Sequence, residues 1–354
     1  MNERPDLRTP IAEQLLINAC AEAEAKRVVC LSLGRAQCAE SIAQSNPDAL
    51  VIAQFLDLYH AQETEEFQLD QLANMSIQCA PDLPDEEIDL FVLPTTKGGE
   101  AELTRDWLQM GYDRLRIGGW LYTAVDNKED KWLFHEVEKL AKGIVRRAKP
   151  RGMIYKLQKK EPLRRLRDFS AEFAFRDGEN LIKLVTRPGV FSHRKLDLGA
   201  RALLEAIQVE PGMNVLDIGC GSGAVGLAAC LRAADVTATL IDSNARAVQC
   251  TEHNAQLNGL SDRVEVLLDA DGSGVDADQF DLAVGNPPYF SNYKIADIFL
   301  HTALKGLKPG GGAAMVTKQP DWFVARMQQL FGGTPRVEEH RGYHVVFSQK
   351  PAAK

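Results

Sequence analysis

The chain has 354 residues, a length at which two domains are more usual than one hydrophobic core. Hydrophobic residues make up 45% of it and charged residues 25%, as in ordinary globular proteins, and no run approaches the roughly 20 apolar residues that a membrane span requires. The amino-terminal segment lacks the apolar core of a signal peptide, so we expect a cytoplasmic protein without a membrane partner. The seven cysteines form no C-x-x-C pair, and we expect no metal site.

The overall charge is acidic, with a net value of −8, which argues against a protein that coats nucleic acid indiscriminately. Residues 139–168 depart from that average, because twelve lysines and arginines stand there against only two acidic residues. This segment therefore carries +10 and the rest of the chain −18. Such a run is commonly a solvated surface, but so steep a local excess also fits contacts with phosphate groups. The candidate phosphate-contacting residues are Arg146, Arg147, Lys149, Arg151, Arg164 and Arg165.

The first half of the chain gives weak signals of alternating strands and helices. Residues 29–34 (VCLSLG) indicate a strand that runs into a turn, and residues 88–90 (IDL) indicate another strand. A charged, proline-containing stretch at 161–177 follows, and we expect it to hold the boundary between two domains, residues 1–165 and 178–354.

The second half alternates clearly between strand and helix signals. Residues 213–218 (MNVLDI) indicate a short buried strand, which is followed by a glycine turn at 219–223 and an apolar helix through Leu231. A strand at 236–241 and a helix through Leu257 repeat the pattern. Further strands are predicted at 264–268, 280–285, 313–317 (after a turn at 309–312) and 342–349. This alternation is typical of a parallel sheet that binds ligands outside the carboxyl ends of its strands.

Landmarks of the first half recur in the second at a nearly constant offset. The IDL strand at 88–90 lies 192 residues before FDL at 280–282, and the Gly-Gly pair at 118–119 lies 192 residues before the pair at 310–311. Two α/β domains with similar turns could produce some of this by chance, but the matching landmarks favour a duplicated domain.

The first copy lacks the residues that would bind a ligand. Where the second has Gly-Cys-Gly-Ser-Gly, the first has Gly34-Arg35-Ala36-Gln37, and side chains at Arg35 and Gln37 would fill the space in which a ligand must meet the backbone. Where the second has Asn-Pro-Pro-Tyr, the first has Leu-Pro-Thr-Thr at 93–96. We therefore expect a degenerate first domain without catalytic activity.

The glycine turn is the strongest cofactor signal. Gly219, Gly221 and Gly223 can adopt positive φ and let the backbone approach a ligand. The helix that begins there offers unpaired N–H groups to a carboxylate, such as that of a methionine moiety. Asp217, just before the turn, is placed to meet a cationic amino group. A turn of this kind also fits a dinucleotide site.

Two further acidic residues complete the expected cofactor site. Asp242 ends the second strand, where an acid binds ribose hydroxyls in both kinds of site. Asp271, with Asp269 as the alternative, follows the third strand and could accept a hydrogen bond from an adenine amino group. Either of these two residues could equally be a loop residue exposed to water.

The tetrapeptide Asn286-Pro287-Pro288-Tyr289 distinguishes the two kinds of cofactor. Its prolines make a stiff platform at the mouth of the sheet. The Asn286 side-chain oxygen and the Pro287 carbonyl can both accept from one NH₂ group and orient its lone pair toward a sulfonium methyl, while Tyr289 offers a flat stacking face. Alone it could be a simple turn. In register with the glycine loop it favours methyl transfer from S-adenosylmethionine over a dehydrogenase.

With these residues the chain resembles class I S-adenosylmethionine-dependent methyltransferases, and among them the two-domain ribosomal-RNA guanine-N2 methyltransferases of the RsmC/RlmG type. The finer resemblance rests on residues 187–192 (RPGVFS) and on Leu196-Asp197-x-Gly199 ahead of the glycine loop. It covers residues 181–354 well and the first 160 only in layout. The family commonly shows N-P-P-F-H, whereas this chain has Tyr289-Phe290, which leaves the acceptor open.

The resemblance implies an α/β fold of two tandem Rossmann-like methyltransferase domains, with a mostly parallel seven-stranded sheet and an antiparallel edge strand. It implies transfer to the 2-amino group of a guanine in ribosomal RNA. Asn286 would hold that amine next to the cofactor, and Phe191 and Tyr289 would frame cofactor and base. The basic residues of 142–167 would grip RNA. The expected partner is ribosomal RNA or a ribosomal subunit particle, and the expected state is a monomer. Adenine N6, a glutamine amide, or a non-catalytic RNA-binding role are the alternatives.

Overall fold

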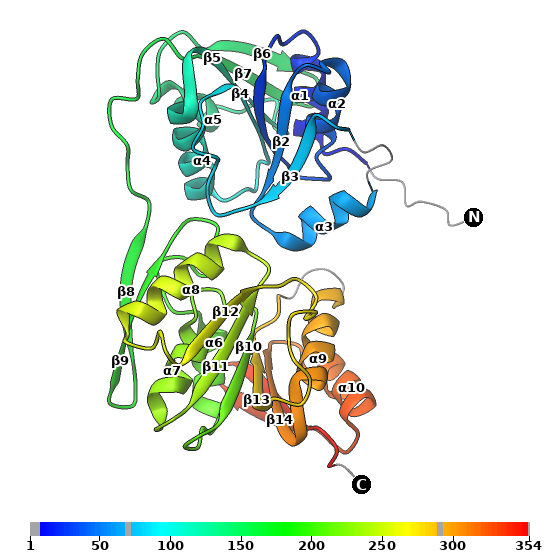
Figure 1. Ribbon diagram of the computed structural model, residues 1–354, viewed down its shortest axis with the longest axis vertical. Coiled ribbons are helices and arrows are strands. Elements are labelled where there is room, and N and C mark those ends of the chain that lie inside the picture. The colour runs from blue at the N-terminus through cyan, green and yellow to red at the C-terminus, as the bar shows by residue number, and fades with distance from the viewer. Residues whose placement is uncertain (1–7, 68–71, 289–292, 353–354) are drawn as a thin grey trace, which may run out of the picture. The chain divides into compact units, whose positions relative to one another are not determined.

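The computed structural model describes residues 8–67, 72–288 and 293–352. The chain divides into two compact units, Met1–Phe169 and Ser170–Lys354, and each contains a seven-stranded sheet with helices on both faces (Figure 1). Within the described ranges, no helix is long and apolar enough to span a membrane.

The first unit is an α/β domain with the strand order β3-β2-β1-β4-β5-β7-β6, whose elements are as follows. The strands are β1 (Arg27–Leu31), β2 (Leu50–Phe55), β3 (Met75–Cys79), β4 (Ile88–Thr95), β5 (Leu115–Val125), β6 (Val145–Lys149) and β7 (Gly152–Gln158). The helices are α1 (Ile11–Cys20), α2 (Gln37–Ser45), α3 (Leu58–Phe67), α4 (Ala101–Arg114) and α5 (Trp132–Glu138). The first three helices share one hydrophobic core with the sheet, and α4 and α5 share another, so the sheet is covered on both faces.

The second unit repeats this plan with the order β12-β11-β10-β13-β14-β16-β15. Its strands are β10 (Asn214–Ile218), β11 (Thr237–Asp242), β12 (Val264–Leu268), β13 (Phe280–Gly285), β14 (Leu307–Thr317), β15 (Arg336–His340) and β16 (Tyr343–Gln349). Its helices are α6 (Leu198–Ala206), α7 (Ala224–Arg232), α8 (Ala245–Leu257), α9 (Lys294–Gly306) and α10 (Pro320–Phe331). The expected fold class is confirmed for both units. The reversed strand β16 lies between β14 and β15, one position in from the edge where we expected it.

The two sheets share an irregularity as well as a strand order. In both, the register shifts near the start of the fourth and fifth strands, β4 with β5 and β13 with β14. Gly118 and Gly310 take positive φ at the matching places, and their N–H groups donate to Lys159 O at 2.7 Å and Lys350 O at 2.9 Å. Residues 309–312, which we predicted to be a turn, therefore form a bulge inside β14. A bulge that recurs at the same position supports the inferred duplication.

Strand pairing corrects the sequence alignment of the two copies. Val28 pairs with Leu90, and Val215 pairs with Leu282, so Val28 corresponds to Val215 and the copies are offset here by 187 residues. Gly34 then corresponds to Gly221 and not to Gly219, because the first copy lacks a glycine directly after its strand.

A two-stranded hairpin, β8 (Ala171–Asp177) and β9 (Asn180–Thr186), precedes the second sheet. The guanidinium of Arg232 in α7 donates to both carboxylate oxygens of Asp177, at 2.7 and 2.9 Å. The side chain of Asn254 in α8 accepts from Val185 N at 2.7 Å and donates to Val185 O at 3.0 Å, as a neighbouring strand would. The hairpin is thus part of the second unit, which begins earlier than residue 178.

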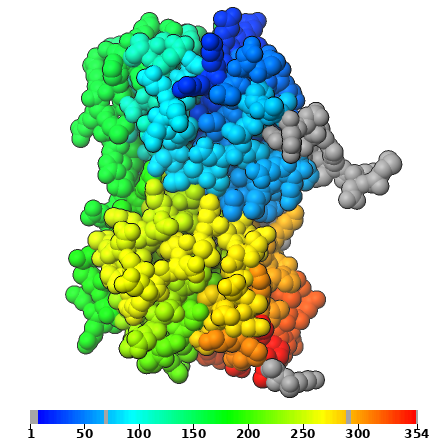
Figure 2. Space-filling model, viewed as in Figure 1, coloured from blue at the N-terminus to red at the C-terminus, as the bar shows by residue number. Residues whose placement is uncertain are grey.

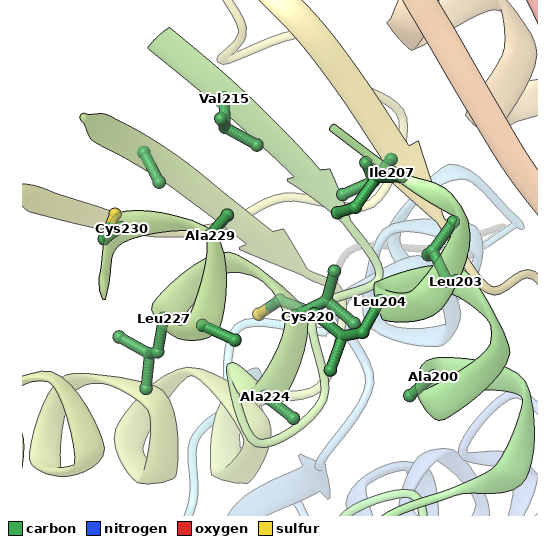
Figure 3. Packing of buried hydrophobic residues seen from close by; sticks show 14 of the residues in the cluster. Ala200, Leu203, Leu204, Ile207, Val215, Cys220, Ala224, Leu227, Ala229 and Cys230 are labelled. Carbon is green, nitrogen blue, oxygen red and sulfur yellow. The ribbon is translucent and has the colours of Figure 1, made fainter. Parts of the chain in front are cut away.

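The second unit is held together by small and aliphatic side chains between α6, α7 and β10. Figure 3 shows Leu204 of α6 beside Cys220 of the glycine loop, with Leu203 on the same helix, Ala224 at the start of α7 and Val215 on β10. All of these side chains are at most 8% exposed. In Figure 2, yellow marks the part of the chain that includes α8 and the edge strand β12, and residues of this part lie at the surface. The core fixes the strand end that carries the glycine loop.

The loop after β1 in the first unit is closed by a side chain of the same unit. Glu13 of α1 is fully buried, and its Oε1 accepts from the Ser32 hydroxyl at 2.7 Å, Leu33 N at 2.5 Å and Gly34 N at 2.8 Å. Glu13 is the third residue of α1, as Ala200 is the third residue of α6. A long carboxylate in the first copy thus replaces a small side chain in the second and occupies the loop's N–H groups.

Candidate functional site

The glycine loop and the Asn-Pro-Pro corner leave adjacent strands at the same edge of the second sheet. β10 and β13 are parallel neighbours, and Ile218 pairs with Gly285. The residues that follow this pair are Gly219 and Asn286. The two motifs therefore begin side by side, although 67 residues separate Gly219 from Asn286 in the chain.

All three glycines of the loop adopt the left-handed backbone expected from the sequence, with φ of +69° at Gly219, +59° at Gly221 and +79° at Gly223. A Cβ at Gly219 would lie 2.4 Å from Phe299 Cζ, and one at Gly223 would lie 2.9 Å from Thr251 Cγ2, so protein atoms already fill those positions. A Cβ at Gly221 would meet nothing within 4 Å. The open side of the loop is thus at Gly221, where a ligand can approach the backbone.

Asp217 lies at the end of β10 beneath this loop. Its side chain is 3% exposed, and its Oδ2 accepts from Gly226 N in α7 at 2.9 Å. Burial, reinforced by the negative charge of Asp242, raises the pKa of Asp217 to about 7. A nearby positive charge would stabilise the ionised form of this carboxyl group, so Asp217 is suited to contact a cationic group of a ligand.

Asp242 connects the second strand to the glycine loop. Its Oδ2 accepts from Gly221 N at 2.8 Å and its Oδ1 from Asn244 N at 2.8 Å. Asn244 caps α8 by accepting from two N–H groups of the first turn, and its Nδ2 donates to Gly189 O at 2.9 Å. Asp242 and the PGVFS segment are therefore fixed to the same helix start.

A buried arginine also anchors the PGVFS segment to α8. Arg246 is completely buried and donates to Pro188 O at 2.8 Å, while Arg187 donates to Gln249 Oε1 at 2.6 Å. Phe191, three residues beyond the anchored Pro188, is 65% exposed and lines the pocket described below. A large aromatic ring on a fixed loop but in contact with solvent is suited to stacking on a planar ligand.

The side-chain amide of Asn286 is fixed in one orientation. Its Nδ2 donates to Oδ2 of Asp197 at 2.9 Å, and the same oxygen accepts from Gly199 N at 2.7 Å and Ala200 N at 3.1 Å at the start of α6. A carboxylate only accepts hydrogen bonds, so the NH₂ end of the amide must face it. The carbonyl oxygen Oδ1 is then the end of Asn286 that can accept from a ligand.

One pocket brings most of the predicted cofactor residues together. The predicted residues that line it are Phe191, Asp217, Gly219, Gly221 and Asn286. Gly223 instead forms the N-cap of α7, and Pro287 is buried. Tyr289, which we predicted to be a stacking residue, lies outside the described residues.

The two candidates for the adenine contact lie outside that lining. Asp269 is 7% exposed, and its carboxylate accepts from the N–H groups of Asp271, Gly272 and Gly274 at 2.9, 2.5 and 2.7 Å. Asp271 is exposed, and hydrogen bonds from Ser273 hold its pKa below the ordinary value. Asp269 thus shapes the loop, and Asp271 remains the candidate whose side chain reaches solvent.

The pocket also contains residues to which the sequence assigned no role. They are Ser192, Lys195, Leu196, Asp197, Cys220 and Ser222, among others. The Leu-Asp-x-Gly motif at 196–199 was visible in the sequence as part of the family resemblance. Its contact with Asn286 was not visible, because 89 residues separate Asp197 from Asn286.

The predicted phosphate-contacting residues are all exposed in the first unit. Arg146, Arg147 and Lys149 lie on β6, the edge strand, and Arg151 lies in the turn to β7. Two other lysines of the basic segment are used internally: Lys156 donates to Ala19 O at 2.8 Å, and the buried Lys159 donates to Leu115 O at 2.6 Å. The further predicted residues, Arg164 and Arg165, follow β7 in the stretch before Phe169.

Comparison with known proteins relates the second unit to methyltransferases. Residues 181–347 match the family model of the methyltransferase small domain. The ribosomal RNA small subunit methyltransferase C of Pseudomonas aeruginosa (strain LESB58) is 32% identical over 180 residues, 49% of this chain and 52% of that protein. The chain thus spans about half the length of this curated relative. The uncharacterized protein YbxB of Bacillus subtilis (strain 168) is 30% identical over 168 residues, 46% of this chain and 83% of that protein.

A solved structure resembles both units. The T. thermophilus 16S rRNA N2 methyltransferase RsmC, determined in complex with AdoMet and guanosine, superposes with a TM-score of 0.79. The match covers 98% of this chain and 94% of that chain at 22% identity. At that level of identity the likeness is one of fold.

Two doubly wound units, one with a glycine loop beside an Asn-Pro-Pro corner, define a protein of the Rossmann-like methyltransferase class. The resemblance inferred from the sequence is thereby confirmed. The chain belongs to the methyltransferase small domain family through its second unit, residues 181–347.

Proposed function

We propose that this protein transfers the methyl group of S-adenosylmethionine to the exocyclic 2-amino group of a guanine in ribosomal RNA. The observation that carries the proposal is the orientation of Asn286, whose amide presents its oxygen beside the open glycine loop because its nitrogen is held by Asp197. The named methyltransferase C relatives and the fold shared with the T. thermophilus enzyme support RNA as the substrate.

The residues of the pocket, together with Asp242, which lies outside its lining, fit this cofactor. The start of α7 can receive a carboxylate beside the open space at Gly221, whose own N–H donates to Asp242, and Asp217 can receive an ammonium group. Asp242 lies at the strand end where ribose hydroxyls are bound in folds of this kind, and Phe191 offers a stacking face. The bound cofactor would supply an electrophilic methyl group on a sulfonium.

Asn286 and Pro287 would act on the acceptor by positioning. The Asn286 Oδ1 and the Pro287 carbonyl accept from the two N–H bonds of an exocyclic amine, which directs the nitrogen lone pair away from them. No strong base would be required, because the nitrogen would be cationic once methylated and would then release one proton to solvent water. The first unit contributes RNA contacts through the basic residues of β6 and of the stretch that follows β7.

The proposal is tested by incubating the full chain with labelled S-adenosylmethionine and ribosomal RNA and identifying the modified nucleoside by mass spectrometry. We expect label in N2-methylguanosine. Asn286→Ala should abolish transfer while the dissociation constant of S-adenosylhomocysteine stays within about threefold, because the amide orients the acceptor. Asn214→Ala, at the opposite end of β10, is the matched control and should leave transfer unchanged.

Other outcomes would replace the proposal. Label in N6-methyladenosine or in a protein glutamine would assign the same site to another acceptor. Cofactor binding without transfer to any of these acceptors would indicate a non-catalytic RNA-binding protein. Equal loss of transfer and cofactor affinity in Asn286→Ala would mean that Asn286 holds the cofactor.

A further inference from the structure

We infer that Asp197 is a positioning residue for methyl transfer, which it supports by fixing the amide of Asn286 with its carbonyl oxygen toward the acceptor. The inference rests on the proposed function, because Asn286 is the residue assigned to the acceptor amine. It assigns a task to the Leu-Asp-x-Gly motif, for which no role in the site was predicted.

A single carboxylate oxygen serves both the helix and the site. Oδ2 of Asp197 accepts from Gly199 N at 2.7 Å and Ala200 N at 3.1 Å, and these bonds hold the carboxylate at the start of α6. The third bond to this oxygen, at 2.9 Å, comes from Nδ2 of Asn286. Since the helix N–H groups fix the oxygen, the oxygen in turn fixes the amide.

The direction of the amide matters for the chemistry. An unrestrained asparagine can rotate and exchange its NH₂ and C=O ends, and an NH₂ end facing an acceptor amine would place donor against donor. The charged partner makes the observed orientation stronger than a neutral partner would, because charge-assisted hydrogen bonds are the stronger kind. The carboxylate also polarises the amide, which makes its oxygen a better acceptor.

Gly199 shows that this arrangement is tightly packed. A Cβ at residue 199 would lie 2.8 Å from Asp197 Oδ2, 3.1 Å from Asn286 Oδ1 and 3.2 Å from Asn286 Nδ2. Any side chain there would push the carboxylate and the amide apart. The glycine of the motif is thus required by the contact between Asp197 and Asn286, and not by a positive φ.

The decisive variant is Asp197→Ser, measured in the full-length protein with the acceptor that the wild type methylates. Serine is a good N-cap and can still bond the first turn of α6, but its side chain is too short to reach Asn286. We expect kcat to fall on the order of 10- to 100-fold, as for a displaced positioning group, with the S-adenosylhomocysteine dissociation constant within about threefold. Asp197→Asn retains an oxygen for all three donors and should restore most of kcat.

A double-mutant cycle separates positioning from a structural role. In the Asn286→Ala background, Asp197→Ser should cause no further loss of kcat, because the group that it orients is gone. Asp130→Ser, which removes a carboxylate that accepts from Leu133 N and Phe134 N at the start of α5, is the matched control and should leave kcat unchanged. Gly199→Ala is a second variant that leaves the carboxylate in place, and it should also lower kcat.

Three results would overturn the inference. One is equal loss of cofactor affinity and kcat in Asp197→Ser, which would make Asp197 a cofactor ligand. Another is full additivity of Asp197→Ser and Asn286→Ala. The third is unchanged kcat in both Asp197→Ser and Gly199→Ala. A wild-type protein that transfers no methyl group at all would instead refute the proposed function, so the two failures are distinguishable.

Discussion

Asp217 is a buried carboxyl group next to a loop that is open to a ligand, and its protonation should control cofactor binding. Its pKa of about 7 means that the folded protein holds a proton there below neutral pH, which an aspartate in water would have released. A ligand whose ammonium group approaches Asp217 favours the ionised form, so binding below pH 7 must release that proton. The affinity should therefore fall as the pH decreases from 8 to 6.

This dependence is measured by calorimetric titration with S-adenosylhomocysteine at several pH values. We expect the affinity to fall by up to about tenfold per pH unit below the pKa, which is the limit for one linked proton. Asp217→Asn cannot ionise, and its affinity should be lower at pH 8 and nearly independent of pH. A wild-type dissociation constant that stays constant from pH 6 to 8 would contradict the role of Asp217.

Features of this site that depend on contiguous residues could be predicted from the sequence. Features that depend on contacts between distant segments could not. The positive φ of Gly219, Gly221 and Gly223 follows from a strand, a tight turn and a helix that are contiguous in the chain, and the structure confirms it. The bond between Asp197 and Asn286 depends on α6 and β13 meeting in space, so no local pattern reports it.

The positive charge of the edge strand β6 predicts that this element contributes to RNA binding. All five of its residues are exposed, as edge strands with charged side chains often are to prevent pairing with other chains. Arg164 and Arg165 add two exposed cations in the stretch after β7. If these groups contact phosphates, each contact releases counterions from the RNA and adds to the salt dependence of binding.

Reversal of charge at four of these positions tests this role. Arg146, Arg147, Arg164 and Arg165, changed together to Glu, should weaken binding to ribosomal RNA at least tenfold and flatten the slope of log K against log salt. The measurement is a filter-binding or fluorescence titration over a salt series. Reversal of Lys128, Lys131, Arg176 and Lys183 produces the same net charge change on other exposed positions and serves as the control. Equal effects of the two quadruple variants would indicate a non-specific effect of net charge.

Elements were predicted best where they are regular. The alternation in the second half of the chain located β10 through β13, but β14 begins at Leu307 and contains residues that we had taken for a turn. Glycine and proline favour turns, and here the neighbouring strand instead accommodates them in a bulge. The hairpin of β8 and β9 was not recognised, because its side-chain pairing with Asn254 and Asn258 has no signature in the hairpin sequence itself.

At the scale of the whole molecule, two copies of one fold differ in the loops that follow the first and the fourth strand of each sheet. The core clusters of the first unit contain residues from 12 to 157, and those of the second unit contain residues from 175 to 346, so each unit has its own core. The duplication was visible in the sequence through the landmarks near the fourth and fifth strands. The closure of the loop in the first copy was not visible, since Glu13, on α1, lies 19 residues before Ser32.

This difference predicts that a cofactor analogue protects only the second unit. The loop of residues 32–34 has N–H groups bonded to Glu13, and a Cβ at Gly34 would lie 2.7 Å from Gln37 Oε1, whereas a Cβ at the matching Gly221 would meet nothing within 4 Å. At 100 times its dissociation constant, a ligand of one site stabilises that site by about 2.7 kcal/mol against opening. Hydrogen exchange with and without S-adenosylhomocysteine should therefore slow in the segment from β9 to Asn286. Exchange at residues 32–37 should not change, whereas slowed exchange there would mean that the first copy still binds the ligand despite Glu13.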